Sequence, residues 1–218
     1  MNRNEAREAV VRTGRLLEER GLTVGTGGNL SVRVEGEELV AIKPSAVPYG
    51  LMTPEDVPLL DLEGRVVEGR CAPSSEWRMH LGVYRARPDA GGVVHTHSRF
   101  ATTLACLKWE IPAVHYLVAA SGDELVPVAP YRTFGSPELA EVAVQALGRR
   151  GKAVLLANHG LLALGADLGE AFGVAEQLEF VAELAWRARC VGEPALLSRE
   201  ETWEALEAFR GYGPGRSS

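Results

Sequence analysis

The stretch that most constrains this chain is Gly92–Ser98, where a run of β-branched residues leads directly into His-Thr-His. The β-branched residues favour a strand, and residues i and i+2 of a strand point to the same face. His95 and His97 would then lie about 6.6 Å apart along one face, with both imidazoles able to reach a single ion. The motif therefore predicts a strand that ends in a pair of metal-binding histidines.

Two other segments can complete such a site. His159 stands in Asn-His-Gly at the predicted tip between two apolar runs, Ala153–Ala157 and Leu161–Leu164. Glu76 follows two serines at the start of a predicted helix and can supply a carboxylate. Three imidazoles and one carboxylate form a ligand set that suits a catalytic Zn²⁺, so we expect these residues to meet.

Each part of this group also has a simpler interpretation. A carboxylate in the first turn of a helix stabilises the helix dipole, which is the default role for Glu76. His80, four residues further on, and His115, in an apolar segment, remain alternative ligands. A cupin site is not favoured, because no glutamate follows the histidine pair at the required spacing and the next segment predicts a helix.

A glycine-rich loop, Gly25–Asn29, has the wrong context for a dinucleotide site, because it follows a helix and precedes a strand. It is either a plain connection or an anion-binding nest made by its amides with the Thr26 and Asn29 side chains. Ser74 and Ser75 would add hydroxyls and amides at a helix N-terminus, where phosphate is favoured, although they can equally serve as caps.

Composition limits the class of protein. With 218 residues, 46% hydrophobic and 24% charged, the chain predicts one domain spanning residues 1–218. The net charge of −6 and the absence of a basic stripe argue against a nucleic-acid partner. No apolar run approaches the length of a membrane span, so we expect no membrane partner. Three widely spaced cysteines, without metal-site spacing, indicate a reducing cytoplasm.

Hydrophobic periodicity and turn signals predict hairpins interleaved with helices. This order favours an α/β fold with a central, largely antiparallel sheet and helices on its faces. The predicted helices cover 4–20, 76–86, 99–107, 136–147, 170–190 and a segment after Ser198. Besides the His-x-His strand, the predicted strands cover 30–34, 39–42, 59–62, 65–67, 114–119, 125–128, 153–157 and 161–164.

Four of these motifs occur in the order seen in the class II aldolase/adducin family, which this chain resembles from about Asn4 to Tyr212. They are Gly-Thr-Gly-Gly-Asn, Pro-Ser-Ser-Glu, Val-Val-His-Thr-His and Asn-His-Gly. The resemblance implies a three-layer α/β/α sandwich around a mixed, mostly antiparallel sheet. It also implies a four-fold homotetramer with each active site at a subunit interface.

Carried over position by position, the resemblance implies one zinc ion per chain, bound by His95, His97 and His159. Glu76 matches the family's acid/base, which also binds the metal before the substrate arrives. Tyr116 matches a tyrosine that reaches the neighbouring subunit's site, and Tyr212 matches one in the C-terminal tail. The phosphate-binding positions correspond to Gly28, Asn29, Ser45, Ala46, Ser74 and Ser75. Ala46 is a departure, because the closest relatives carry glycine there.

Within the family, the resemblance is closest to the branch that cleaves L-fuculose 1-phosphate into dihydroxyacetone phosphate and lactaldehyde. A metal mechanism is preferred over an imine, because nothing marks any of the three lysines as a Schiff-base residue. Pentulose-phosphate 4-epimerases and a methylthioribulose-1-phosphate dehydratase share the scaffold, but the epimerases carry Asp in place of Glu76 and another acid near Tyr116. The adducin branch is a non-catalytic interaction domain without the histidine set. The sequence does not identify the aldehyde.

Overall fold

A computed structural model describes residues 1–211, so the predicted role of Tyr212 falls outside the described residues. Its centre is one eight-stranded sheet in the order β4-β3-β2-β1-β5-β8-β7-β6. All neighbouring strands are antiparallel except β6 and β7. The strands are β1 Asn29–Arg33, β2 Leu39–Ile42, β3 Leu59–Asp61, β4 Val66–Glu68, β5 Gly92–Thr96, β6 Val128–Ala129, β7 Ala153–Leu156 and β8 Gly160–Gly165.

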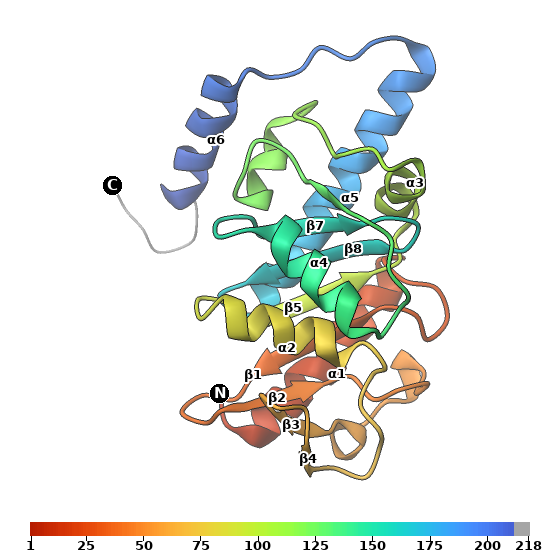
Figure 1. The fold of residues 1–218 in the computed structure, drawn as a ribbon, viewed down its shortest axis with the longest axis vertical. Coiled ribbons are helices and arrows are strands. Elements are labelled where there is room, and N and C mark those ends of the chain that lie inside the picture. The colour runs from red at the N-terminus through yellow and green to blue at the C-terminus, as the bar shows by residue number, and fades with distance from the viewer. Residues whose placement is uncertain (212–218) are drawn as a thin grey trace.

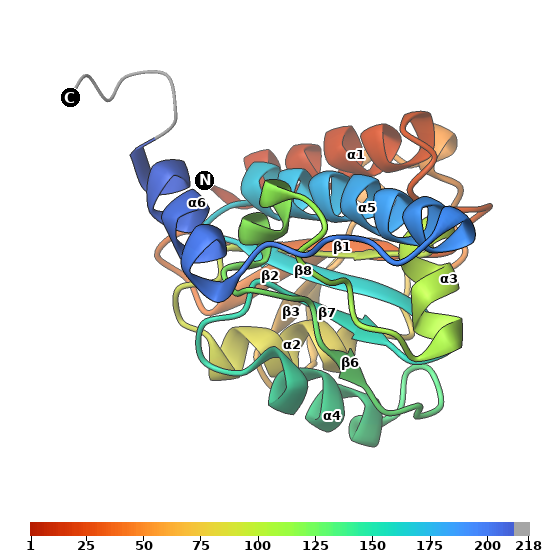
Figure 2. The same ribbon diagram turned by 90° about the horizontal axis from the view of Figure 1, so that it is seen from above.

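Helices cover both faces of this sheet (Figure 2). Two of them, α1 Arg3–Glu19 and α5 Leu168–Val191, lie on one face, and α2 Trp77–Ala86 and α4 Pro137–Leu147 lie on the other. The three-layer α/β/α sandwich is therefore confirmed. The remaining helices are α3 Arg99–Leu107 and α6 Arg199–Gly211, with 3₁₀ turns η1 Tyr49–Leu51, η2 Pro54–Asp56 and η3 Tyr116–Ser121.

The central strands supply a hydrophobic core on each side. On β5, Val94 packs into the cluster under α1 and α5, whereas its neighbour Val93 packs into the cluster under α2 and α4. On β8, Leu161 and Leu162 divide in the same way. Strands that are covered on both faces need no polar residues, which explains their continuous apolar runs. This double burial fixes the middle of the sheet, from which the histidines project.

One predicted strand is wrong. The apolar segment Ala113–Ala120, with its predicted strand at 114–119, contains the 3₁₀ turn η3 instead. The Leu117 amide donates to the Nδ1 atom of His115 at 3.2 Å, which caps this turn. Val118 and Ala119 are buried, and η3 packs on α5 and α6. A short apolar run predicts burial but does not distinguish a helical turn from a strand.

The strand predicted at 125–128 is displaced rather than absent. Val126 pairs with Ile111 in an isolated bridge, and the strand itself is β6, at Val128–Ala129. Elsewhere the predicted boundaries agree with the structure to within a few residues. Of the helices within residues 1–211, none is long and apolar enough to cross a bilayer.

Candidate active site

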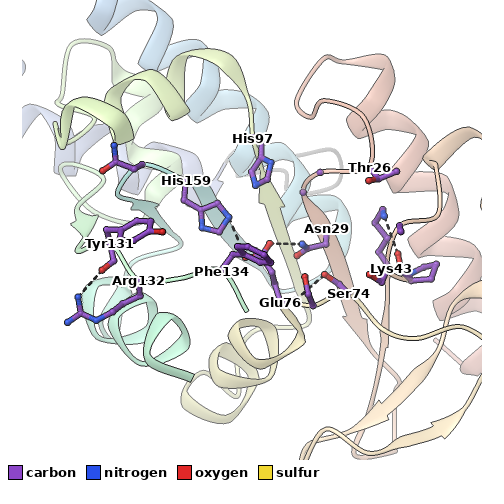
Figure 3. A pocket seen from close by; sticks show the side chains of 17 residues that line it. Thr26, Asn29, Lys43, Ser74, Glu76, His97, Tyr131, Arg132, Phe134 and His159 are labelled. Carbon is purple, nitrogen blue, oxygen red and sulfur yellow. Dashed lines mark hydrogen bonds and ion pairs between the residues drawn. The ribbon is translucent and has the colours of Figure 1, made fainter. Parts of the chain in front are cut away.

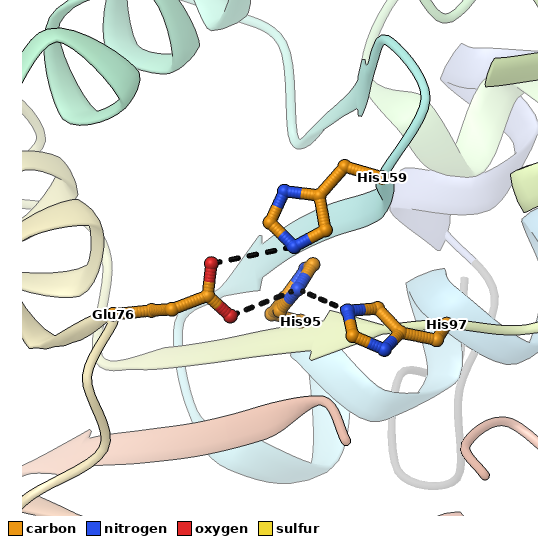
Figure 4. Close-up of side chains that lie close together, drawn as sticks. All are labelled: Glu76, His95, His97 and His159. Atoms are coloured by element: carbon orange, nitrogen blue, oxygen red, sulfur yellow. Dashed lines mark hydrogen bonds and ion pairs between the residues drawn. The ribbon is translucent and has the colours of Figure 1, made fainter. Parts of the chain in front are cut away.

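Four predicted ligands converge at the centre of the molecule (Figure 4). His95 lies on β5, His97 follows the end of that strand, His159 lies in the turn between β7 and β8, and Glu76 is the N-cap of α2. One ligand atom from each of these side chains lies within 4.8 Å of those of the other three. The fold therefore brings together residues that are up to 83 positions apart in the chain, from 76 to 159.

The contacts within this cluster are direct. The Nε2 atom of His95 lies 3.0 Å from Nε2 of His97 and 3.2 Å from Oε2 of Glu76. The Nε2 atom of His159 lies 3.3 Å from the other carboxylate oxygen, Oε1. The Nδ1 of His95 donates to the carbonyl oxygen of Leu161 at 2.9 Å, which leaves Nε2 facing the cluster.

These residues fit a divalent metal ion. Oε1 of Glu76 is buried and accepts no hydrogen bond from the described residues. Buried carboxylate oxygens are normally satisfied, so this atom indicates a partner supplied by something other than the protein. Three imidazole nitrogens and one carboxylate oxygen are a donor set typical of Zn²⁺.

The electrostatics of the cluster are strongly coupled. Burial alone would raise the pKa of Glu76, but the nearby His95 and His159 and the Asn29 hydrogen bond outweigh it and hold that pKa well below its usual range. Burial and the neighbouring His95 lower the pKa values of His97 and His159 to about 4 each. Both imidazoles are therefore neutral near pH 7, as metal ligands must be.

Close backbone approach helps to hold the histidines together. A Cβ atom on Gly160 would lie 2.2 Å from the carbonyl oxygen of Thr96 and 3.1 Å from the ring of His97. Only glycine allows the turn that carries His159 to approach β5 so closely. Its neighbour Asn158 has a φ of 56°, a left-handed conformation that asparagine tolerates better than most residues.

A pocket of about 430 Å³ opens beside Glu76, His97 and His159 (Figure 3). The structure places every predicted phosphate-binding residue on its lining, namely Thr26, Gly28, Asn29, Ser45, Ala46, Ser74 and Ser75. The backbone amide of Glu76 donates to the hydroxyl of Ser74 at 3.3 Å. This serine is therefore hydrogen-bonded to the residue that carries the carboxylate. Three of the four predicted metal ligands, Glu76, His97 and His159, therefore line the same cavity as the predicted phosphate-binding residues, whereas His95 is fully buried.

Sequence reasoning missed Lys43, which also lines this pocket. Its side chain is buried, donates to the Pro44 carbonyl at 3.1 Å and lies 4.7 Å from the centre of the Tyr49 ring. Burial lowers its pKa to about 8. The only signal in the sequence is its position next to Pro-Ser-Ala, the segment with phosphate-binding residues.

A loop between β6 and α4 forms another wall of the pocket and was also missed. It contributes Tyr131, Arg132 and Phe134, and both aromatic rings are more than half exposed. Figure 3 places this loop on the His159 side of the pocket, away from Lys43 and Thr26. Two aromatic residues in a loop just before a helix cap are the signal that the sequence offered.

Three other candidates lie elsewhere. Tyr116 is on η3, is 53% exposed, stacks against Phe209 with ring centres 6.1 Å apart and does not line the pocket of its own chain. His115 stacks beside Tyr116 and caps η3. His80 is fully buried, hydrogen-bonded to Asn29 and Ser31, and is not part of the metal-ligand cluster.

Comparisons with known proteins identify the family. The model of the Class II Aldolase and Adducin N-terminal domain matches residues 8–186. The chain is 47% identical over 207 residues to the 5-deoxy-D-ribulose 1-phosphate aldolase of Bacillus thuringiensis serovar kurstaki, covering 95% of this chain and 96% of the relative. It is 42% identical to a 5-methylthioribulose-1-phosphate/5-deoxyribulose-1-phosphate aldolase of Rhodospirillum rubrum, with coverage of 95% and 92%.

Among solved structures, an L-fuculose 1-phosphate aldolase superposes with a TM-score of 0.91 and 42% sequence identity, covering 94% of this chain and 96% of that one. The chain therefore belongs to the class II aldolase and adducin family. Its similarity to aldolases over nearly the full length makes it a lyase rather than a non-catalytic member.

Proposed function

We propose that this protein is a zinc-dependent aldolase that cleaves a ketose 1-phosphate into dihydroxyacetone phosphate and an aldehyde. The observation that carries the proposal is the shared pocket, in which Glu76, His97 and His159 of the four-residue cluster face a second group of hydroxyls and loop amides. A group of metal-ligating residues alone would suit many hydrolases. A group of metal-ligating residues next to a phosphate-binding wall suits a phosphorylated substrate whose carbon skeleton reaches the metal.

His95, His97 and His159, together with Glu76, would hold the metal, one ion per chain. When bound, this Lewis acid stabilises the negative charge that C3–C4 cleavage leaves on the dihydroxyacetone phosphate fragment. The phosphate would lie against Thr26, Gly28, Asn29, Ser45, Ala46, Ser74 and Ser75. Lys43 adds the positive charge that this wall otherwise lacks.

Glu76 would return a proton to C3 of the enediolate after cleavage, or remove it in the condensation direction. The carboxylate is 5% exposed and lies at the boundary between the metal and phosphate groups, so it faces the carbon between the carbonyl and the broken bond. Its low pKa keeps the carboxylate ionised at neutral pH, which is the form that would bind a metal ion or take a proton in the condensation direction.

Tyr116 would accept the proton of the C4 hydroxyl during cleavage and return it in the condensation direction, acting in the site of a neighbouring chain. It lies outside the pocket of its own chain and its ring is half exposed, which supports a role at a subunit interface. The family resemblance adds a homotetramer and a role for Tyr212 of the tail. A closed ring would give each Glu76 a Tyr116 from the next subunit.

The aldehyde would be one with an apolar end. The names of the relatives indicate fuculose, 5-deoxyribulose and methylthioribulose phosphates, and all three sugars end in a methyl or methylthio group. Tyr131 and Phe134 offer an aromatic wall on the side of the pocket away from the phosphate residues. This wall supports a substrate whose far end carries no charge.

Product analysis tests the proposal. Purified protein loaded with Zn²⁺ would be incubated with L-fuculose 1-phosphate, 5-deoxyribulose 1-phosphate, methylthioribulose 1-phosphate and ribulose 5-phosphate. We expect dihydroxyacetone phosphate and an aldehyde from at least one of the first three. A 4-epimer from ribulose 5-phosphate, or a dehydrated product from methylthioribulose 1-phosphate, without dihydroxyacetone phosphate, would overturn the aldolase assignment.

The shared site has its own test. Tyr116→Phe and Glu76→Gln should each be nearly inactive, and a mixture should regain activity after dissociation and reassociation. Random equal mixing in a ring restores roughly one site in four, since a site needs its own Glu76 and its neighbour's Tyr116. Subunit exchange confirmed by native mass spectrometry, without recovery, would place both residues in one chain or remove Tyr116 from catalysis.

We also infer one domain over residues 1–218 and a cytoplasmic location. The three cysteines, Cys71, Cys106 and Cys190, are all unpaired, which supports a reducing compartment.

A further inference from the structure

We propose that Tyr84, Ser31, His80 and Asn29 form a positioning relay that holds the Glu76 carboxylate in its working orientation. The relay is a buried series of hydrogen bonds behind the active site. The inference rests on the proposed function, in which Glu76 is both the acid/base and a metal ligand.

The relay forms because side chains are spaced similarly along helix α2 and strand β1. Helix α2 begins after Glu76 and places His80 and Tyr84 four and eight residues further on, on the same face. Strand β1 places Asn29 and Ser31 on one face, two residues apart. Four helical residues rise about 6 Å and two strand residues about 6.7 Å, so the two sets of side chains interleave.

The hydrogen bonds form one unbroken series. The Nδ2 of Asn29 donates to Oε2 of Glu76 at 3.0 Å, and its Oδ1 is hydrogen-bonded to Nε2 of His80. The Nδ1 of His80 lies 2.7 Å from the hydroxyl of Ser31, which in turn lies 2.9 Å from the hydroxyl of Tyr84. Figure 3 shows the last step of this series, between Asn29 and Glu76.

The proton positions follow from the partners. A carboxylate only accepts, so the amide nitrogen of Asn29 must face Glu76 and its oxygen must face His80. Burial, together with the nearby His95, lowers the pKa of His80 to about 3, so its imidazole is neutral. The neutral ring then donates from Nε2 and accepts at Nδ1 from Ser31, which accepts from Tyr84. Every donor points toward Glu76.

All four side chains of the relay are shielded from solvent. Asn29 is 4% exposed, and the other three side chains are at most 1% exposed. Beyond Tyr84, the guanidinium of Arg33 lies 4.7 Å from the centre of the tyrosine ring. A buried polar series is unfavourable unless every member is satisfied, and apolar residues would fill the same space without that requirement. The series ends at the Glu76 carboxylate in the active site, so we expect it to affect the position of that carboxylate.

The relay also makes the two oxygens of Glu76 unequal. Oε2 receives the Asn29 hydrogen bond and lies 3.2 Å from Nε2 of His95, whereas Oε1 accepts no hydrogen bond from the described residues and lies 3.3 Å from Nε2 of His159. Holding one oxygen fixes the rotation of the carboxylate. The relay therefore leaves Oε1 as the oxygen without a hydrogen bond from residues 1–211, free to bind the metal or accept a moving proton.

Two substitutions at His80 test this. His80→Leu removes the donor to Asn29, whereas His80→Gln keeps an N–H at a similar reach. We expect His80→Leu to lower both kcat and Zn²⁺ affinity roughly 10- to 100-fold, the usual effect of losing an outer-shell partner. KM for the ketose phosphate should stay nearly constant, and His80→Gln should recover most of both losses. Zn²⁺ affinity is measured by competition with a chelator.

Two serine substitutions distinguish loss of the relay from a general loss of stability. Ser31→Ala interrupts the relay, whereas Ser121→Ala removes a similarly buried hydroxyl at the end of η3, which bonds to the backbone of Asp123. We expect a loss of about tenfold in kcat and Zn²⁺ affinity for Ser31→Ala and none for Ser121→Ala. This pair decides the question if His80→Leu does not fold.

Equal losses in both His80 variants, or equal effects of the two serine substitutions, would overturn the relay. If the wild-type protein binds Zn²⁺ but cleaves no ketose phosphate, the proposed function is wrong, and the Zn²⁺ affinities alone decide on the relay.

Discussion

At one end of the pocket lie the side chains proposed to hold the metal, Glu76, His97 and His159, with His95 buried next to them, whereas at the other end three loops present hydroxyls and backbone. His95 and His159 lie on or between strands that are covered on both faces. The loops around Gly28, Ala46 and Ser74 lie beyond the ends of their elements. The metal end thus depends on the chemistry of individual side chains, and the phosphate end depends on backbone shape and one lysine. Substitutions should abolish the reaction at the first end and weaken binding at the second.

The largest effect is expected at the metal end. His97→Ala should lose the bound metal and the activity together, because Glu76 is also needed as the acid/base, so only two histidines would remain as lasting ligands, one fewer than the three protein ligands usual for a catalytic Zn²⁺. Elemental analysis of the purified variant measures the metal, and His115→Ala, a histidine outside the cluster, should keep one ion per chain. A His97→Ala protein that lacks metal and remains active would contradict the assignment.

Glu76→Gln tests the same end with the metal retained. The variant should still bind metal through three histidines but lose roughly 10²- to 10⁴-fold in rate, the usual contribution of a positioned acid/base. Exchange of the C3 proton of dihydroxyacetone phosphate in D₂O follows this step directly. Exchange as fast as in the wild type would assign the base to another residue.

The phosphate end should respond in binding rather than in chemistry. Lys43→Met should raise KM roughly 10- to 100-fold with little change in kcat, since hydrogen bonds to charged groups contribute about 1.5–3 kcal/mol. The Lys43 ammonium is present below its pKa of about 8 and is lost above it, so wild-type KM should rise as the pH passes through that value. Lys43→Met should lack this rise. A wild-type KM that stays flat there would remove Lys43 from phosphate binding.

The smallest effect is expected at Ala46, whose φ of 57° is left-handed. Glycine removes a strain of about 1–2 kcal/mol there but loses about 0.5–1 kcal/mol through the entropy of the unfolded chain. Ala46→Gly should therefore raise the free energy of unfolding by about 1 kcal/mol or less, without changing kcat. The same substitution at Ala41, in strand β2, should lower it. Equal destabilisation at both positions, measured by denaturant unfolding, would show that the phosphate loop is not strained.

The contrast between the two ends also explains what the sequence could predict. The His-x-His strand, the Asn-His-Gly turn and the start of α2 are signalled by local patterns, and the helix predicted at 99–107 coincides with α3. Segment 113–120 was mispredicted because its burial against α5 and α6 is a tertiary effect. Periodicity does not reveal which element will cover an apolar run.

Within the site, long side chains were the least predictable. A lysine is expected in solvent, and only the structure shows that Lys43 is buried at the pocket with its ammonium 4.7 Å from the centre of the Tyr49 ring. The hydrogen bonds of His80 depend on how α2 lies along β1, and a sequence does not state that alignment. The glycine-rich loop does lie between a helix and a strand, as predicted, since it follows α1 and precedes β1.

The single parallel pairing in the sheet affects which segment can vary in sequence and length during evolution. Strands β6 and β7 are parallel, so α4 must cross over between them, and residues 130–136 pass beside the pocket before α4 begins. The loop meets the phosphate wall at Gly135, where a Cβ would lie 2.7 Å from the carbonyl oxygen of Ser75. Since β6 is the outermost strand, insertions ahead of that glycine disturb no strand register. Under the proposed function, changes in this short segment would alter the aldehyde that is accepted while the proposed metal and phosphate residues stay unchanged.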